Sequence, residues 1–163
     1  MASIFNATKL TVTISTQITI NGNEINSSNQ LIIPNITQYD KRILSIPTSV
    51  QTNILQFTTG VSAGTYIAAN VKFICITNLD DTNYVRIRVT KASAETFDIK
   101  LAAGQSYIMG NVQESASANA ASFSSFVDAT AIAAEANTAA VNIQTIVACI
   151  KRRNSKLTCL YSL

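Results

Sequence analysis

The chain has 163 residues, enough for a single domain with a substantial core. Apolar residues make up 47% and charged residues only 13% of the sequence, about half the usual charged share of roughly 25%. The formal net charge is +3, but four of the basic residues lie among the last thirteen, and the rest of the chain has eight basic and nine acidic side chains. A nearly neutral body does not follow a phosphate backbone, which argues against a nucleic-acid-binding domain. A surface with so few charges suits packing against other subunits, so we expect a component of an assembly that also forms homo-oligomers.

Composition also argues against catalysis. The chain has no histidine, which removes the commonest general base and the commonest zinc ligand. Cys75, Cys149 and Cys159 are too few and too irregularly spaced for a disulfide framework, and the acidic pair Asp80-Asp81 lacks the spacing of a calcium-binding loop. We find no phosphate-binding loop, no nucleophile elbow, no signal peptide and no apolar run of about 18 residues. We therefore expect no enzymatic activity, no cofactor or metal and no membrane association.

The first elements are predicted to be strands. Apolar and polar residues alternate over 10–20, and Asn21-Gly22 then gives a strong signal for a two-residue hairpin turn. A short return strand follows, and 26–30 is predicted to be a polar loop. Residues 31–33 form another apolar run that ends at Pro34, which cannot donate a hydrogen bond to a sheet.

Residues 34–53 are predicted to be an irregular loop or arm. Two prolines and a cluster of charged residues break up any periodic pattern in this segment. Ile43, Leu44 and Ile46 are apolar enough to pack against a neighbouring subunit, so we take them as candidate partner-binding residues.

The stretch 72–109 predicts four strands and three turns. Val85, Ile87 and Val89 alternate with Tyr84, Arg86 and Arg88, which places one set in a core and the other on an outward face. The outward set either docks a carboxylate-rich partner or is a solvated face balanced by Asp98 and Lys100 on the next strand. We keep Tyr84, Arg86 and Arg88 as candidate partner-binding residues.

The alanine-rich stretch near the C-terminus is ambiguous. Strand alternation favours two antiparallel strands over 129–136 and 140–148, joined through Asn137-Thr138, and a helix over 127–137 is the alternative. With the strands above, this predicts an all-β, antiparallel, jelly-roll-like sandwich of about eight strands with extended arms, formed as one domain by 1–148.

Residues 149–163 are predicted to be a tail. Basic and apolar side chains are interleaved there, and apolar residues at a terminus tend to dock. We favour a protein contact over a DNA contact for this tail; a frayed terminus is the alternative. Its candidate partner-binding residues are Lys151, Arg152, Arg153, Leu160 and Tyr161.

Three short motifs occur in the order Ile76–Asn78, Leu101–Ser106 and Val147-Ala148. In this order they resemble small β-sandwich virion structural proteins of tailed bacteriophages, either decoration (cement) proteins or neck- and tail-associated proteins. The resemblance covers about 70–148 and leaves the tail unexplained. It implies a virion protein assembled in the host cytoplasm, most simply a capsid decoration protein that binds the major capsid protein or other neighbouring subunits through its sheet face and arms. The alternatives are a neck- or tail-associated component and a receptor- or glycan-binding fibre module. The fibre module would need exposed aromatic residues on loops, and the chain has no Trp and five Tyr.

Overall fold

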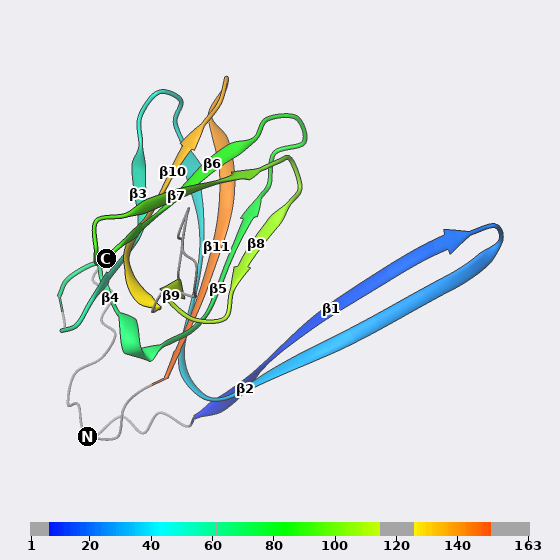
Figure 1. Ribbon diagram of the computed structural model, residues 1–163, viewed down its shortest axis with the longest axis horizontal. Helices are drawn as coiled ribbons and strands as arrows, with labels where there is room; N and C mark the ends of the chain where they lie inside the picture. Colours follow the sequence, from blue (N-terminus) through cyan, green and yellow to red (C-terminus); the bar gives the residue numbers. More distant parts are fainter. Residues whose placement is uncertain (1–6, 61, 115–125, 151–163) are drawn as a thin grey trace, which may run out of the picture.

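The computed structural model describes residues 7–60, 62–114 and 126–150, and strands account for most of them (Figure 1). The only helical element within these ranges is the short 3-10 helix η1 (Ala68–Asn70). The strands are β1 (Thr8–Ile20), β2 (Asn23–Ile46), β3 (Thr52–Thr58), β4 (Tyr66–Ile67), β5 (Val71–Asn78), β6 (Val85–Lys91), β7 (Thr96–Leu101), β8 (Ser106–Met109), β9 (Gln113–Glu114), β10 (Val127–Ala136) and β11 (Val141–Ile150).

The strands form two sheets that pack face to face as a sandwich. One sheet has the order β1-β2-β11-β5-β8 and the other β4-β3-β10-β6-β7, with β9 added to β10. Eight of these strands form the body: β2, β3, β5, β6, β7, β8, β10 and β11. Numbered in chain order, they run 1-8-3-6 in one sheet and 2-7-4-5 in the other, which is the order of a jelly roll. The predicted all-β sandwich is therefore confirmed; β1, β4 and β9 are additions to it.

The core lies between the two sheets and follows the pleat of each strand. On β6 the residues Val85, Ile87 and Val89 are fully buried, as the alternation predicts. Opposite them, β11 and β5 contribute further isoleucines and valines, and β10, the neighbour of β6 in the same sheet, contributes buried alanines. The alternative of a helix over 127–137 is wrong, because β10 pairs with β3 and β6 along this segment.

Two segments predicted to be loops are strand in the structure. Residues 26–30 and 34–46 lie in β2, which runs without interruption from Asn23 to Ile46. The hairpin turn fixes a register that continues through the polar residues, and the later half of β2 pairs with β11. Pro34 and Asn35 fall where the register shifts between Leu10↔Ile33 and Thr8↔Ile36. Proline has no backbone N–H, so it fits at a bulge, where the hydrogen-bonded ladder is interrupted. The bulge also accommodates the left-handed conformation of Asn35 (φ 62°).

The motifs Ile76–Asn78 and Leu101–Ser106 meet in space at a buried asparagine. The Asn78 amide nitrogen donates to the carbonyl oxygens of Asn83 (2.8 Å) and Leu101 (3.1 Å), and its side-chain oxygen accepts from the backbone N–H of Asp80 (2.9 Å). The backbone N–H of Asn78 donates to the Gln105 carbonyl at 2.9 Å. The Asn78 side chain thus links the β5–β6 and β7–β8 connections. These two motifs therefore have a structural role in the fold.

Replacing Asn78 with alanine should lower the free energy of unfolding by about 1–3 kcal/mol, because buried carbonyl and N–H groups would lose their partner. Urea unfolding followed by circular dichroism measures the change. Asn142→Ala, at an exposed position on β11, is the matched control and should change stability by less than about 0.5 kcal/mol. Equal losses in the two variants would contradict this account of Asn78.

Candidate interaction surface

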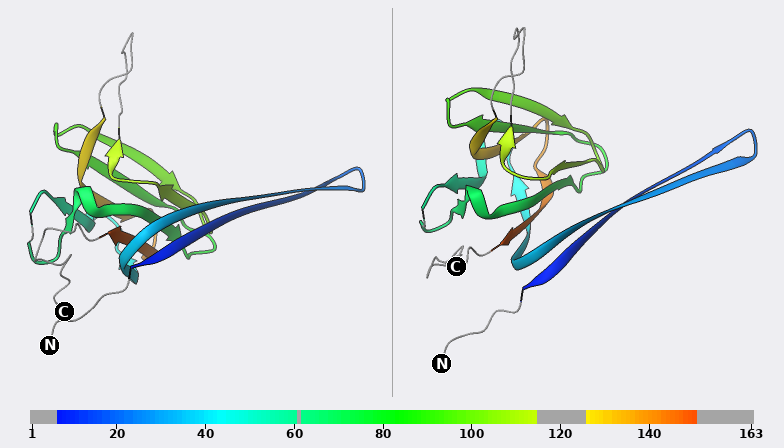
Figure 2. Two further views of the ribbon diagram at one scale, coloured as in Figure 1. Left: turned by 90° about the horizontal axis from the view of Figure 1, so that it is seen from below. Right: turned by 60° about the horizontal axis from the view of Figure 1, so that its bottom comes forward.

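The most prominent feature of the surface is a β-hairpin that projects from the body (Figures 1 and 2). We call residues 8–33, which comprise β1 and the first half of β2, the arm. Its two strands are joined by Asn21 and Gly22, whose φ angles of 51° and 79° are those of the predicted type I′ turn. Beyond the base of the arm, β1 and β2 pair only with each other among the described strands. Away from its base, the arm is therefore a two-stranded ribbon whose two faces are both exposed among the described residues.

The two faces of the arm differ sharply in chemistry. Cross-strand partners share a face, so the register assigns each residue to one side. One side, which we call the arm face, has no charged residue and consists of Leu10, Val12, Ile14, Thr16, Ile18, Ile20, Asn23, Ile25, Ser27, Asn29, Leu31 and Ile33. The other side, the back face, is rich in hydroxyl and amide groups, and Ile32 is its only large apolar residue within 11–32.

The large side chains of the arm face are exposed. Ile14, Ile18, Ile25 and Leu31 have exposed fractions of 54%, 51%, 56% and 50%. An isolated two-stranded hairpin is at best marginally stable in water, and apolar residues grouped on one face do not stabilise it unless something covers them. Beyond its base, the arm face is therefore an apolar surface that the described residues of the body leave exposed.

At its base the arm face merges with the outer side of the five-stranded sheet. Leu10, Val12 and Ile33 pack against a second, small apolar cluster formed by Ile36, Phe73 and Ala148. This cluster lies on the side of the sheet that faces away from the main core, because the pair Ala148 and Phe73 adjoins the core pair Val147 and Ile74 along β11 and β5 and so points to the opposite side. Further exposed apolar side chains continue this outer side: Tyr39, Ile43 and Ile108. The apolar surface thus extends from the arm onto the body.

The strand that carries the arm is fixed to the opposite sheet by a half-buried polar cluster. The Tyr66 hydroxyl on β4 donates a hydrogen bond to Asp40 and accepts one from Arg42 at 2.5 Å, and Arg42 pairs with Asp40 at 2.9 Å. Burial of the phenol, reinforced by its bond to Asp40, raises the pKa of Tyr66. The cluster ties β2 to β4 across the sandwich and so holds the root of the arm.

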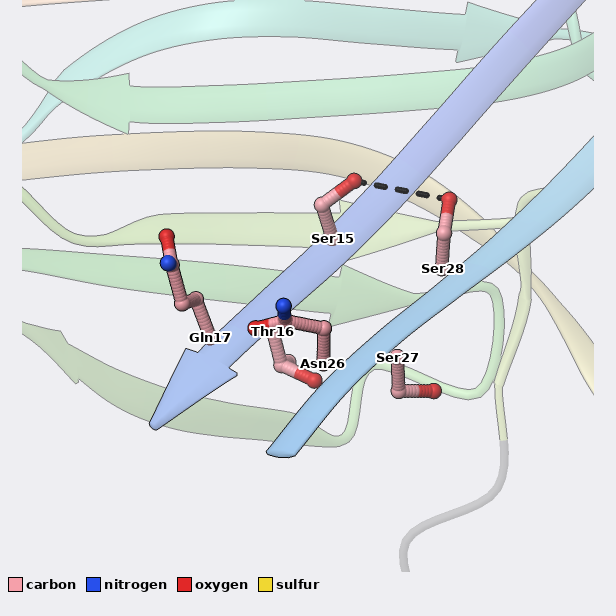
Figure 3. A pocket seen from close by; sticks show the side chains of 6 residues that line it. All are labelled: Ser15, Thr16, Gln17, Asn26, Ser27 and Ser28. Carbon is pink, nitrogen blue, oxygen red and sulfur yellow. Dashed lines mark hydrogen bonds between the residues drawn. The ribbon is translucent and has the colours of Figure 1, made fainter. Parts of the chain in front are cut away.

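The arm also carries a shallow polar hollow. It is lined by Ser15, Thr16, Gln17, Asn26, Ser27 and Ser28, and Figure 3 shows Ser15 and Ser28 side by side, with their hydroxyl oxygens 3.5 Å apart. These residues come from a two-stranded ribbon and include both of its faces. Such a site has no walls that could enclose a small molecule, so it does not indicate a ligand pocket.

The predicted basic strip on β6 is neutralised by neighbouring carboxylates. Arg88 forms a bidentate pair with Asp98, with Nε and Nη2 at 2.6 and 2.7 Å from its carboxylate oxygens, and Arg86 pairs with Glu135 at 2.5 Å. The guanidinium of Arg88 holds the pKa of the Asp98 carboxyl below its usual range. The ammonium group of Lys100 lies 4.5 Å from the ring centroid of Tyr84. The strip is thus a balanced outer face, in which Asp98 provides the predicted counter-charge and Glu135 a further one.

The remaining predicted partner-binding residues fall into three environments. Ile43 is 63% exposed on the outer side of the five-stranded sheet, next to the apolar surface described above. Leu44 is half-buried against the core, and Ile46 is fully buried within it, so the prediction that Ile46 contacts a partner is wrong. The core takes Ile46 because 34–46 is a sheet strand. The five tail residues Lys151, Arg152, Arg153, Leu160 and Tyr161 lie outside the described residues.

Sequence reasoning identified the Asn21-Gly22 turn but not the arm face. The signal was present: apolar residues sit at equal distances on either side of the turn, as in Ile18 with Ile25 and Val12 with Leu31. If the hairpin register is extended through the polar residues 26–30, the apolar partners Ile18, Ile25, Val12 and Leu31 all fall on one face.

Across 7–60, 62–114 and 126–150, no three His, Cys, Asp or Glu side chains are grouped so that they could hold a metal ion. None of the helices in these ranges has the length and apolarity that a membrane crossing requires. The sequence matches no known family model and no curated protein. Function must therefore be inferred from the surface itself.

The free energy of unfolding should decrease as the pH is lowered through about 4, where unfolded aspartate titrates. Asp98, held by Arg88, and Asp80, which accepts from the backbone N–H groups of Asn83 and Thr82, both have lowered pKa values. The unfolded chain then binds more protons than the folded chain, so their stabilisation is present above the unfolded pKa and is lost in acid.

Thermal melting of wild type and Asp98→Asn at about pH 7 and about pH 3 tests this expectation. Asp98→Asn should lose less stability between the two conditions than wild type does. Asp81→Asn, which replaces an exposed carboxylate and keeps the side-chain oxygen that accepts from the Thr82 hydroxyl, is the control and should keep the wild-type dependence. The same dependence in wild type and Asp98→Asn would refute the role given to this pair.

The exposed apolar residues of the arm should contribute little to the stability of the body. The variant Ile14→Thr/Ile18→Thr/Ile25→Thr/Leu31→Thr, which we call the arm-face variant, should change the free energy of unfolding by less than about 1 kcal/mol in total. Ile74→Ala, in the core between the sheets, should lower it by about 2–5 kcal/mol. Urea unfolding measures both changes, and a large loss in the arm-face variant would show that the body depends on these side chains.

Proposed function

We propose that this protein is a structural subunit of a virus particle, most specifically a capsid decoration (cement) protein of a bacteriophage. The observation that carries the proposal is the arm face, an uncharged row of large apolar side chains displayed on a ribbon that projects from a stable body. A surface of this kind is functional when another subunit covers it.

The energetics of the arm support an attachment role. Burying one large aliphatic side chain contributes about 1.5–3 kcal/mol, and four such side chains on the arm face are at least half exposed. Part of this gain offsets the entropy lost on association and on ordering the two-stranded arm. Covering the arm face thus provides a stable attachment without any catalytic chemistry.

The open edges of the arm add a second mode of contact. β1 is the edge strand of its sheet, and beyond the body β2 is also an edge. Neither edge within 10–33 has a proline, and the only charged side chain there is that of Glu24. Such edges accept a further strand from a neighbour, whose main-chain hydrogen bonds add affinity to the apolar contact.

The assignment to a phage particle has two supports. The body is a jelly roll, an architecture that many viral capsid proteins share, and the order of three short motifs resembles tailed-phage virion proteins. The nearly neutral surface, with Arg86 and Arg88 paired to carboxylates, is unsuited to binding nucleic acid. Fold alone does not define function, so the docking surface remains the main argument.

Immunogold labelling or cryo-electron microscopy of intact particles should locate the protein in many copies at regular positions on the shell. Its absence from purified particles would overturn the proposal, and a few copies at a fibre tip would favour a receptor-binding module instead.

Re-addition of recombinant protein to particles stripped of it should show that the arm face is required for attachment. The arm-face variant should lose binding, measured by co-sedimentation, by at least ~10-fold. Its matched control places four threonines on the back face (Ser15→Thr/Asn26→Thr/Ser28→Thr/Gln30→Thr) and should bind as wild type. Equal loss in both variants would point to general damage to the arm.

A further inference from the structure

β2 has an open edge along the arm, and this edge begins where β11 ends. β2 pairs with β1 on one side and with β11 on the other. The last pair with β11 is Ile150↔Ile36, whereas β1 pairs along 23–36 on the opposite side. Along 23–35, therefore, no described strand occupies the side of β2 that β11 occupies in the body.

We propose that residues 151–163, which lie outside the described part of the chain, continue β11 along this edge and make the arm a three-stranded sheet. β11 runs antiparallel to β2 and ends at the base of the arm, so a chain that continues in the same direction stays antiparallel as far as the tip. Residues 151–163 are as many as residues 23–35, so they can span the whole edge without a connecting loop. The inference does not depend on the proposed function.

The apolar pattern of the segment fits one register. On one side of a strand over 156–163 every residue is apolar, and Leu160 is the one apolar residue on the other side; the apolar side consists of Leu157, Cys159, Tyr161 and Leu163. If the pairing of Ile150 with Ile36 continues without a shift, these four lie opposite Asn29, Ser27, Ile25 and Asn23, all on the arm face. A shift by one residue in either direction would turn them to the back face. The last described pair therefore sets the register that groups the apolar side chains.

The base of the arm is the irregular point on this path. β2 bends there (Figure 1), and 34–35 form the bulge opposite β1. In the continued register 151–152 lie opposite this bulge, so each strand has two residues with which to pass the bend and the pairs beyond it stay in step. Arg153 then lies beside Ile33, where its long side chain can follow the apolar surface with the guanidinium in water.

A third strand supplies what the two-stranded arm lacks. Two strands alone are marginally stable in water, whereas three strands with an apolar face are not. In the proposed register Tyr161 lies beside Ile25, and Leu157 is diagonal to Leu31. Because the segment is joined to β11, its local concentration at this edge is high, which lowers the entropic cost of pairing. The added strand widens the arm face and leaves β1 as the open edge for a neighbour.

A disulfide tests the register, because Cys159 is expected opposite Ser27. In the Ser27→Cys variant of the full chain the two thiols belong to paired residues, whose Cα atoms lie about 4.5–5.5 Å apart in an antiparallel sheet, within the range of a disulfide. Treatment with oxidised glutathione and mass spectrometry of the peptides should show a link between positions 27 and 159 within one chain. Ser28→Cys is the matched control; its thiol faces the back of the arm and should link at least ~10-fold less.

Hydrogen exchange of the wild-type chain tests the same arrangement without a substitution. A central strand uses nearly every backbone N–H in hydrogen bonds to its two neighbours, whereas an edge strand uses every second one. The amides of 24–33 on β2 should therefore be protected at consecutive positions, and those of 11–20 on β1 at alternate positions. Alternate protection in both strands would show that β2 is an edge and would overturn the proposal.

The cross-linking outcomes are equally decisive. Equal links in the Ser27→Cys and Ser28→Cys variants, or no link in either, would contradict the register. A link between two chains, seen as a dimer on a non-reducing gel, would assign the strand to a neighbouring copy and overturn the pairing within one chain. A monomeric link from Cys159 to position 27, with consecutive protection along β2, is the result expected.

Discussion

The surface of this protein depends on β2, a strand that lies in two environments along one unbroken backbone. Its second half is hydrogen-bonded to β11 inside the sandwich, and its first half pairs only with β1 in the arm. Backbone hydrogen bonds and the polar cluster of Asp40, Arg42 and Tyr66 therefore fix the direction of the arm, with no flexible linker in between. Anchoring at the root limits the directions that the arm can take, which lowers the entropy lost when the arm is covered.

The two outer faces of the sandwich have contrasting chemistry. On the six-stranded sheet, arginines and carboxylates are paired across strands, which leaves a polar and electrically balanced surface. On the five-stranded sheet the outer side is apolar around Phe73 and Ile43 and continues onto the arm face. The molecule thus has one face suited to solvent and one suited to contact, and the arm extends the second beyond the body.

Local patterns are sufficient to predict the alternation in β6 and the Asn21-Gly22 turn, because both are set by neighbouring residues. Residues 26–30 and 34–46 are strand although their sequence predicts loops, and the reason is physical. Polar side chains and Pro34 have low intrinsic preference for strands, and here pairing with distant residues on β1 and β11 decides the conformation. Non-local pairing also explains why Ile46 is in the core and why Arg86 and Arg88 find Glu135 and Asp98.

The open edges of the arm have a consequence for how the protein must be handled by the cell that makes it. Long, regular edges with few charges are templates on which further strands add, and repeated addition leads to fibrous aggregates. The nearest irregularity is the bulge at Pro34 and Asn35, which lies at the base of the arm and leaves the edges of 10–33 regular. Under the proposed function, synthesis of this chain in excess of the subunits that cover the arm should therefore favour insoluble deposits.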